Sequence, residues 1–96
     1  MMMTKREIHL SSQFKKDVRR ARKQGKDLQL LNTIVTMLAN DEPLDSKFRD
    51  HALSGNWSGF RECHLSPDWL LVYRKSDQGQ LLLSLARAAS HSNLNF

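Results

Sequence analysis

Hydrophobic residues change their spacing near the middle of this 96-residue chain, and that change limits the folds it can adopt. Before residue 40 they recur three or four residues apart, the spacing of an amphipathic helix. After residue 60 they alternate or form short apolar runs, as strands do. The sequence therefore predicts helices in the first half and a sheet in the second, within an α+β domain.

Two helices are predicted in the first half. Residues 13–24 carry a narrow apolar stripe after a serine N-cap signal, and Gly25 ends this helix. A second helix begins after Asp27, which can cap it, and ends near Asn40. Because about two residues join the helices, they are expected to pack as an antiparallel hairpin.

Strands are predicted on both sides of these helices. A short strand covers 5–10, and three more cover 60–65, 68–75 and 80–87, whereas the glycine-rich segment 51–59 is predicted to be loop. The expected order is β-α-α-β-β-β, a twisted antiparallel sheet with an N-terminal helical hairpin packed on one face. Residues 1–96 contain no repeat or linker, which predicts a single domain.

Positive charge is concentrated at the N-terminal end. Residues 1–26 hold nine Lys and Arg against two acidic residues, a net of +7, whereas residues 27–96 hold six against eight, a net of −2. This pattern predicts a polyanion or an acidic protein partner, the alternative being a solvated helix with no specific partner. The candidate residues for binding such a partner are Lys15, Lys16, Arg19, Arg20, Arg22 and Lys23.

Cysteine content and hydropathy suggest the compartment. No apolar run approaches the roughly 20 residues of a membrane span, so no membrane partner is expected. Cys63 is the single cysteine, which excludes an internal disulfide and suits a reducing compartment. The sequence predicts a cytoplasmic protein.

Titratable residues gather at one predicted edge of the sheet. His64 ends one strand and Asp68 begins the next, while His51 precedes the glycine loop and His91 follows the last strand. Beside arginines such as Arg61, this set suits RNA cleavage, in which the substrate supplies its own 2′-OH nucleophile. The protein then provides a base, an acid and cations, and no cofactor or metal is required.

Other interpretations of these residues remain open. The three histidines could bind zinc, although no Cys-x-x-Cys or His-x-x-x-His pair supports this. Asp68 could be a turn residue after Pro67. Cys63 is expected to face away from His64, which disfavours a Cys-His dyad. Trp57 and Trp69 are expected in the core, and His9 is excluded from the site.

The second half of the chain closely resembles the YafQ-type toxins of the RelE/ParE superfamily. The resemblance rests on "DHALSGNWSGFRECHLSPDWLLVYR" at 50–74 and "LARAASHSNL" at 85–94. It implies a RelE-like fold and a type II toxin that cuts messenger RNA in the ribosomal A site. It also implies inhibition by a cognate antitoxin encoded beside it, with operator DNA reached only through the antitoxin complex.

The resemblance also implies roles for particular residues. The catalytic set is His91, His64, Asp68 and His51, with His91 as the principal acid–base residue. Arg87 and Arg61 are expected to bind substrate, and the basic helix to face ribosomal RNA.

The chain departs from the family pattern at two positions. Ala89 replaces the usual glycine before Ser-His, which predicts a changed loop around His91 because alanine tolerates positive φ poorly. Phe96 lies one residue further from His91 than usual and is left out of the catalytic set. Two competing hypotheses are a non-enzymatic inhibitor of a protein such as DNA gyrase, and a nucleic-acid-binding module without catalysis.

Overall fold

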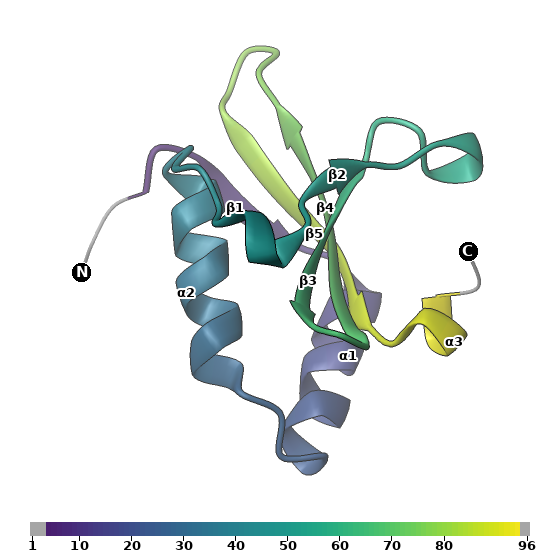
Figure 1. Ribbon diagram of the computed structural model, residues 1–96. Helices are drawn as coiled ribbons and strands as arrows, with labels where there is room; N and C mark the ends of the chain where they lie inside the picture. Colours follow the sequence, from purple (N-terminus) through teal and green to yellow (C-terminus); the bar gives the residue numbers. More distant parts are fainter. Residues whose placement is uncertain (1–3, 95–96) are drawn as a thin grey trace.

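A five-stranded sheet lies at the centre of residues 4–94, the part of the chain that the computed structural model describes (Figure 1). Three α-helices and two short 3₁₀ helices accompany it in this range. The strands are β1 (Glu7–Leu10), β2 (His51–Ala52), β3 (Arg61–Ser66), β4 (Trp69–Ser76) and β5 (Leu82–Ala89). The helices are α1 (Ser12–Lys23), α2 (Leu28–Ala39), η1 (Ser46–Phe48), η2 (Gly55–Trp57) and α3 (His91–Leu94).

The sheet is mixed, so the prediction of an all-antiparallel sheet was wrong. Its strand order is β1-β5-β4-β3-β2, and β1 runs parallel to β5 while the other pairs are antiparallel. The long connection through the helices allows the first strand to pair in parallel with the last one. The predicted element order also lacked β2 and α3.

Local sequence signals account for the two long helices. The Ser11 hydroxyl accepts a hydrogen bond from the Phe14 N–H at 2.9 Å and begins α1. Gly25, at φ +72°, follows its end. The Asp27 carboxylate accepts from the Leu30 N–H at 3.0 Å and begins α2. Both helices lie within one residue of their predicted bounds because capping and periodicity are local properties.

The two helices do not form the closely packed hairpin that was predicted. They are joined at one end and diverge from there, and α1 lies along β5 (Figure 1). A groove lined by Phe14, Val18, Leu31 and Val35 separates them. Each helix therefore buries its apolar stripe mainly against the sheet. The stripe on α1 is too narrow to pack against both the sheet and α2.

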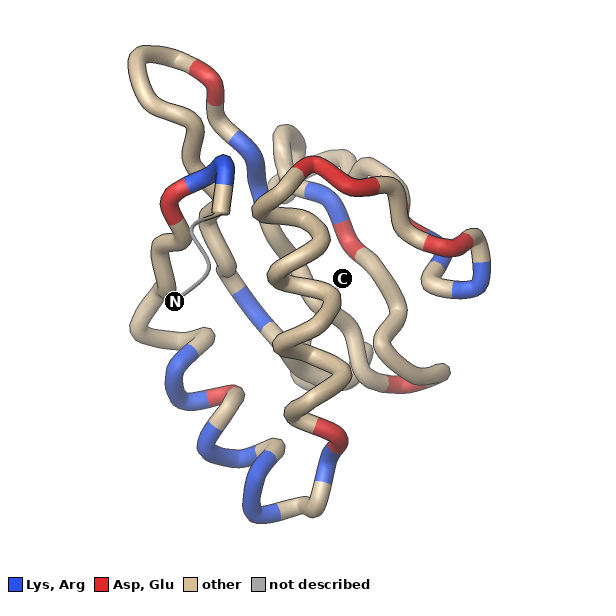
Figure 2. Tube along the Cα trace, turned by 90° about the vertical axis from the view of Figure 1, so that its left-hand side faces the viewer, with Lys and Arg blue, Asp and Glu red and all other residues tan. Residues whose placement is uncertain are grey.

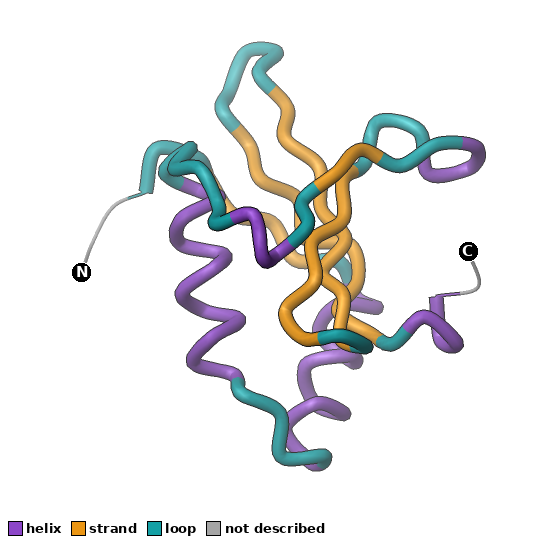
Figure 3. The backbone as a smooth tube through the Cα atoms, in the orientation of Figure 1, coloured by secondary structure: helices purple, strands orange, loops and turns teal. Residues whose placement is uncertain are grey.

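The sheet is covered on both faces. Leu71, Tyr73 and Leu83 belong to the main core beneath α1 and α2. Leu70 and Val72 point to the other face, where they pack in a smaller cluster with side chains from the 53–60 segment and from α3. This accounts for the continuous apolar run of β4. The segment between α2 and β3 is mostly loop, but it contains η1, β2 and η2 (Figure 3).

The end of β5 leads directly into the site. Ala89 is the last residue of this strand and is buried. Among the non-glycine residues of 4–94, only Asp41 and Arg49 have positive φ, so Ala89 does not. Alanine is therefore not strained at the position where the family usually has glycine. Phe96 lies outside the described residues.

Candidate active site

Three histidines from separate elements meet at one end of the sheet. His51 lies on β2, His64 on β3 and His91 at the first position of α3. The ring centroids of His51 and His64 are 6.1 Å apart, and those of His64 and His91 are 5.8 Å apart. The structure thus brings together side chains that are 40 residues apart in the chain.

Asp68 orients His91. Its Oδ1 accepts a hydrogen bond from the His91 backbone N–H at 3.2 Å and lies 3.3 Å from His91 Nδ1. These two contacts lower the pKa of the Asp68 carboxyl, which favours its ionised form. An ionised carboxylate holds the proton on Nδ1 and leaves Nε2 of His91 to face a substrate.

Glu62 is a buried carboxylate between the other two histidines. Its side chain is 4% exposed, and Oε1 lies 3.3 Å from His64 Nε2 and 3.8 Å from His51 Nε2. The sequence hypothesis did not include Glu62, although a signal was present. Residues two apart on a strand share a face, so Glu62 had to accompany His64.

Burial dominates the acid–base properties of His64. The imidazole is 16% exposed, and desolvation lowers its pKa below the ordinary histidine value. Glu62 opposes this shift, whereas positive charge on His91, Arg49 and His51 adds to it. His64 is therefore neutral at pH 7 and able to accept a proton.

His51, Glu62 and His64 also form a set of possible metal ligands. One ligand atom from each lies within 4.8 Å of the others. His51 Nδ1 donates to the Arg49 carbonyl at 2.7 Å, which leaves the Nε2 lone pair directed at Glu62. A proton or a cation would satisfy this arrangement, and imidazole with carboxylate suits Zn²⁺ or Cu²⁺.

The structure does not bring Arg61 to the histidine cluster. Because Arg61 adjoins Glu62 on β3, its side chain points to the opposite face of the sheet. There its guanidinium binds Asp50 at 3.3 and 3.4 Å, and Asp50 also accepts from the Tyr73 hydroxyl at 2.6 Å.

Arg87 is held in a largely buried ion pair. Its Nε and a terminal nitrogen bind the Asp17 carboxylate at 2.8 and 3.3 Å, and the Ala88 N–H donates to the same carboxylate at 3.0 Å. The Asp17 side chain is 0% exposed and that of Arg87 is 18% exposed. This contact joins α1 to the edge of β5 beyond β1.

Two cations that the sequence hypothesis did not include line the groove beside the histidines. Lys47 and Arg49 contribute to a groove of about 710 Å³ that reaches His64 and His91. Arg49 has φ +50°, a left-handed conformation that is unusual for a residue with a side chain and concentrates at functional sites. No local sequence signal marked it, because arginine is not a residue type that favours this conformation.

The exposed basic residues of α1, which lie along the helix in Figure 2, give it a cationic surface. The one acidic residue in this helix, Asp17, is buried against β5, so it does not neutralise the exposed face. The exposed members are Lys15, Lys16, Arg19, Arg20, Arg22 and Lys23.

The remaining candidates lie away from the cluster. His9 is on β1, at the opposite edge of the sheet, and lies 3.5 Å from Glu7. Cys63 faces away from His64, as predicted, and is buried in the main core, where burial raises the pKa of its thiol to about 12. Trp69 is also buried in that core, while Trp57 packs edge-on against Phe60 over the second face.

Comparison with known proteins gives one consistent family. The family model described as a bacterial toxin of type II toxin–antitoxin systems, YafQ, matches residues 6–95. The "mRNA interferase toxin YafQ" of Escherichia coli strain K12 is 40% identical over 93 residues, which cover 96% of this chain and 98% of that protein.

Solved structures agree with this match. The toxin chain in the crystal structure of the E. coli DinJ–YafQ toxin–antitoxin complex has a TM-score of 0.84 at 40% identity, covering 94% of this chain and 97% of that one. A crystal structure of a metal-bound toxin from Helicobacter pylori has a TM-score of 0.87 at 46% identity, with 96% and 99% covered.

Helices long and apolar enough to cross a membrane do not occur within residues 4–94.

Proposed function

Because this chain belongs to the YafQ family of bacterial type II toxins, we propose that it is an endoribonuclease that cuts messenger RNA. The observation that carries the proposal is the set of three imidazoles within about 6 Å of their neighbours, one of them oriented by Asp68. A protein that only binds a partner has no need of such a set. The name of the E. coli relative supports the same activity.

His64 and His91 divide the acid–base work in this mechanism. His64 is neutral at pH 7 because burial lowers its pKa, so it accepts the proton of the RNA 2′-OH. The 2′-oxygen attacks the adjacent phosphorus, and the bond from phosphorus to the 5′-oxygen breaks. His91 protonates that oxygen, and the contact of its Nδ1 with Asp68 orients the ring for this step. The products are a 2′,3′-cyclic phosphate and a 5′-hydroxyl.

Arg49 supplies the positive charge for the phosphoryl group. Its guanidinium is close enough to His64 to lower the pKa of that imidazole, and it lines the same groove as His91. Arg61 and Arg87 are occupied by Asp50 and Asp17, which makes them poorer candidates than the sequence hypothesis assumed. His51 positions the substrate at the β2 side of the cluster.

This chemistry requires no metal ion. A divalent ion held by His51, Glu62 and His64 would supply a Lewis acid. It would also take the His64 imidazole as a ligand, so this residue could no longer act as the base.

The cationic surface of α1 supports a polyanionic target. We propose that the toxin acts in the cytoplasm on translating ribosomes and cuts in the A site, with α1 facing ribosomal RNA. We also propose a cognate antitoxin that inhibits it and links it to operator DNA. The E. coli relative YafQ forms a toxin–antitoxin complex with DinJ, which supports the expectation of an antitoxin.

The proposal is tested by mapping messenger RNA 5′ ends on translating ribosomes, with wild type and with His91→Ala. In-frame cuts that require both the ribosome and His91 are the expected result. His9→Ala, at the other edge of the sheet, is the matched control and should cut like wild type. Cells that stop growing without any cuts would instead indicate a gyrase-type protein target.

A further inference from the structure

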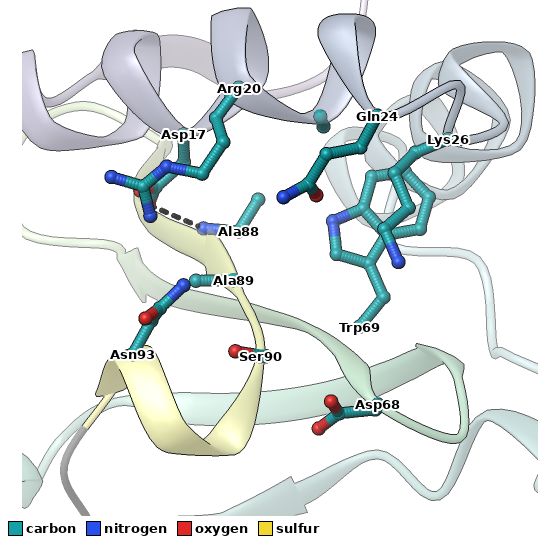
Figure 4. A pocket seen from close by; sticks show the side chains of 11 residues that line it. Asp17, Arg20, Gln24, Lys26, Asp68, Trp69, Ala88, Ala89, Ser90 and Asn93 are labelled. Carbon is teal, nitrogen blue, oxygen red and sulfur yellow. Dashed lines mark hydrogen bonds between the residues drawn. The ribbon is translucent and has the colours of Figure 1, made fainter.

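A polar cavity of about 330 Å³ lies next to Asp68, outside the groove that contains the histidines (Figure 4). Arg20, Gln24 and Lys26 reach it from α1 and the residues that follow this helix. Asp68 and Asn93 line the opposite wall, and the buried Trp69 closes one side (Figure 4). Its volume is at the lower end of the roughly 300–1,000 Å³ of small-molecule sites.

Among the charged side chains that line this cavity, the cations outnumber the carboxylates that have no cationic partner. The Asp17 carboxylate is already bonded by Arg87 and by the Ala88 N–H, and Asp68 is bonded by His91. Within residues 4–94, the side chains of Arg20 and Lys26 have no hydrogen bond or ion pair. Two unpaired cations around a small polar cavity favour an anionic ligand.

The cavity adjoins the candidate active site at Asp68. That carboxylate lines the cavity and also contacts His91, which lines the grooves on the other side. Lys26 faces Asp68 closely enough to add to the lowering of its pKa that the His91 hydrogen bonds cause. An RNA strand with its scissile phosphate at His64 and His91 would therefore cross Asp68 into this cavity.

We propose that the cavity binds the nucleotide next to the scissile phosphate, with its phosphate on Arg20 and Lys26 and its base edge at Gln24 and Asn93. Amide side chains present both a donor and an acceptor, which suits a base edge. This inference rests on the proposed function and extends it with a second subsite for single-stranded RNA. A carboxylate of a protein partner would match the cations, but it would not explain why the cavity opens on Asp68.

Binding is measured in a His91→Ala background so that the RNA stays intact. The probe is a fluorescein-labelled, unstructured hexaribonucleotide, and its anisotropy is followed over a series of salt concentrations. Adding Arg20→Gln and Lys26→Gln should raise Kd about tenfold at low salt. The slope of log Kd against log salt should fall by about 0.7, as expected when one phosphate fewer of a single strand is neutralised.

The matched control removes one lysine and one arginine elsewhere. Lys5 lies beside β1 and Arg74 lies over the Phe60 ring, so Lys5→Gln with Arg74→Gln removes the same charge away from the cavity. This pair should leave the slope unchanged, and all variants should keep the parental melting temperature. Equal effects of the two pairs would overturn the subsite, because only net charge would then matter.

Recognition of the base by Gln24 and Asn93 is tested by a separate measurement. In the otherwise wild-type protein, Gln24→Ala with Asn93→Ala should change how the cutting frequency depends on the base at one position beside the cut. Unchanged base preferences would overturn this part of the proposal.

The outcomes separate this inference from the proposed function. If wild type cuts no messenger RNA, the proposed endonuclease function is wrong. The binding comparison in the His91→Ala background still shows whether the cavity binds RNA. If RNA binding is insensitive to Arg20→Gln with Lys26→Gln while antitoxin binding weakens, the cavity belongs to a protein interface and the subsite is overturned.

Discussion

At the scale of single residues, opposing effects of burial and charge set the chemistry of His64. Desolvation lowers its pKa, and the carboxylate of Glu62 at 3.3 Å opposes this by favouring the protonated imidazole. The proximity of Glu62 follows from the spacing along β3, but the desolvation does not, because burial depends on what covers the strand.

Glu62→Gln should therefore lower the pKa of His64 further. Cleavage requires neutral His64, so activity falls as pH falls through this pKa, and the acidic limb of the pH–rate profile should move to lower pH. An NMR titration of the imidazole measures the shift directly. Glu7→Gln, beside His9 at the far edge, is the control and should leave it unchanged. A raised pKa of His64 in Glu62→Gln would contradict this account.

Arg49→Gly separates the chemical role of Arg49 from a structural one. Glycine accepts φ +50° without strain, so the free energy of unfolding should change by no more than about 1 kcal/mol. Cleavage should fall about 10²–10³-fold, as for the loss of one donor to a developing negative charge. The test combines a denaturation curve with a cleavage rate, and Arg49→Lys should retain more activity. Full activity in Arg49→Gly would remove Arg49 from the mechanism.

At the scale of elements, α1 is joined to the sheet by a buried ion pair. Asp17 receives hydrogen bonds from Arg87 and from the Ala88 N–H, which lies on β5 beyond the end of β1. The carboxylate thus accepts a hydrogen bond from a backbone N–H at a part of the β5 edge where no neighbouring strand pairs.

Arg87→Gln should destabilise the protein by about 3–5 kcal/mol, because it leaves the buried Asp17 charge without its partner. Asp17→Asn with Arg87→Gln should recover part of this loss, which a double-mutant cycle of unfolding free energies would detect. Arg87→Gln that folds with wild-type stability yet binds RNA poorly would instead support the phosphate contact expected from the family resemblance.

A second ionic cluster connects the end of α2 to the β4–β5 hairpin. Arg6 binds Asp41 and Asp77 at 2.6 Å each, and Lys75 binds Asp41 at 2.8 Å. The Arg6 hydrogen bond is the largest cause, followed by that of Lys75, and together they lower the pKa of Asp41 to about 2.

Asp41 should contribute stability that is lost in acid. Its pKa is lower in the folded state, so the contribution is complete above about pH 4 and disappears as pH falls toward 2. After allowance for solvent screening, Asp41→Asn should cost about 1 kcal/mol at pH 7. Asparagine tolerates φ +57°, so the backbone is preserved. Urea denaturation between pH 2 and pH 7 measures the effect, and a constant difference between the two proteins would contradict it.

At the scale of the whole molecule, the cationic surface and the acid–base residues lie on different elements. The outer face of α1 is cationic, whereas the acid–base cluster is formed by β2, β3 and α3 (Figures 1 and 2). The helix can therefore attract a polyanion while the opposite strand edges and α3 hold the reactive groups.

Lys16→Gln, Arg19→Gln and Lys23→Gln together reduce the net charge from +5 to +2, since each removes one positive charge. Ribosome binding should weaken, and its salt dependence should fall by about 0.7–0.9 in logarithmic slope for each phosphate that is no longer neutralised. Stability should change by no more than about 0.5 kcal/mol per exposed site. Co-sedimentation with ribosomes at several salt concentrations tests this, and undiminished binding would mean that the helix is only solvated.

The sequence alone predicted the features that depend on neighbours in the chain. Ser11 and Asp27 cap the helices as expected, and the β3–β4 hairpin follows from short-range alternation. Cys63 faces away from His64, as the alternation of a strand requires. Three histidines and an aspartate were assigned to one edge because they flank strand ends.

Only the tertiary structure decided the partners that are distant in sequence. The parallel pairing of β1 with β5 joins residues 75 positions apart, and the ion pair of Arg87 with Asp17 spans 70. The burial of Glu62 and the left-handed backbone of Arg49 also depend on segments packed around them. Periodicity and caps report the contacts of a residue with its neighbours in the chain. Charge pairing, desolvation and strain depend on which surfaces meet after folding.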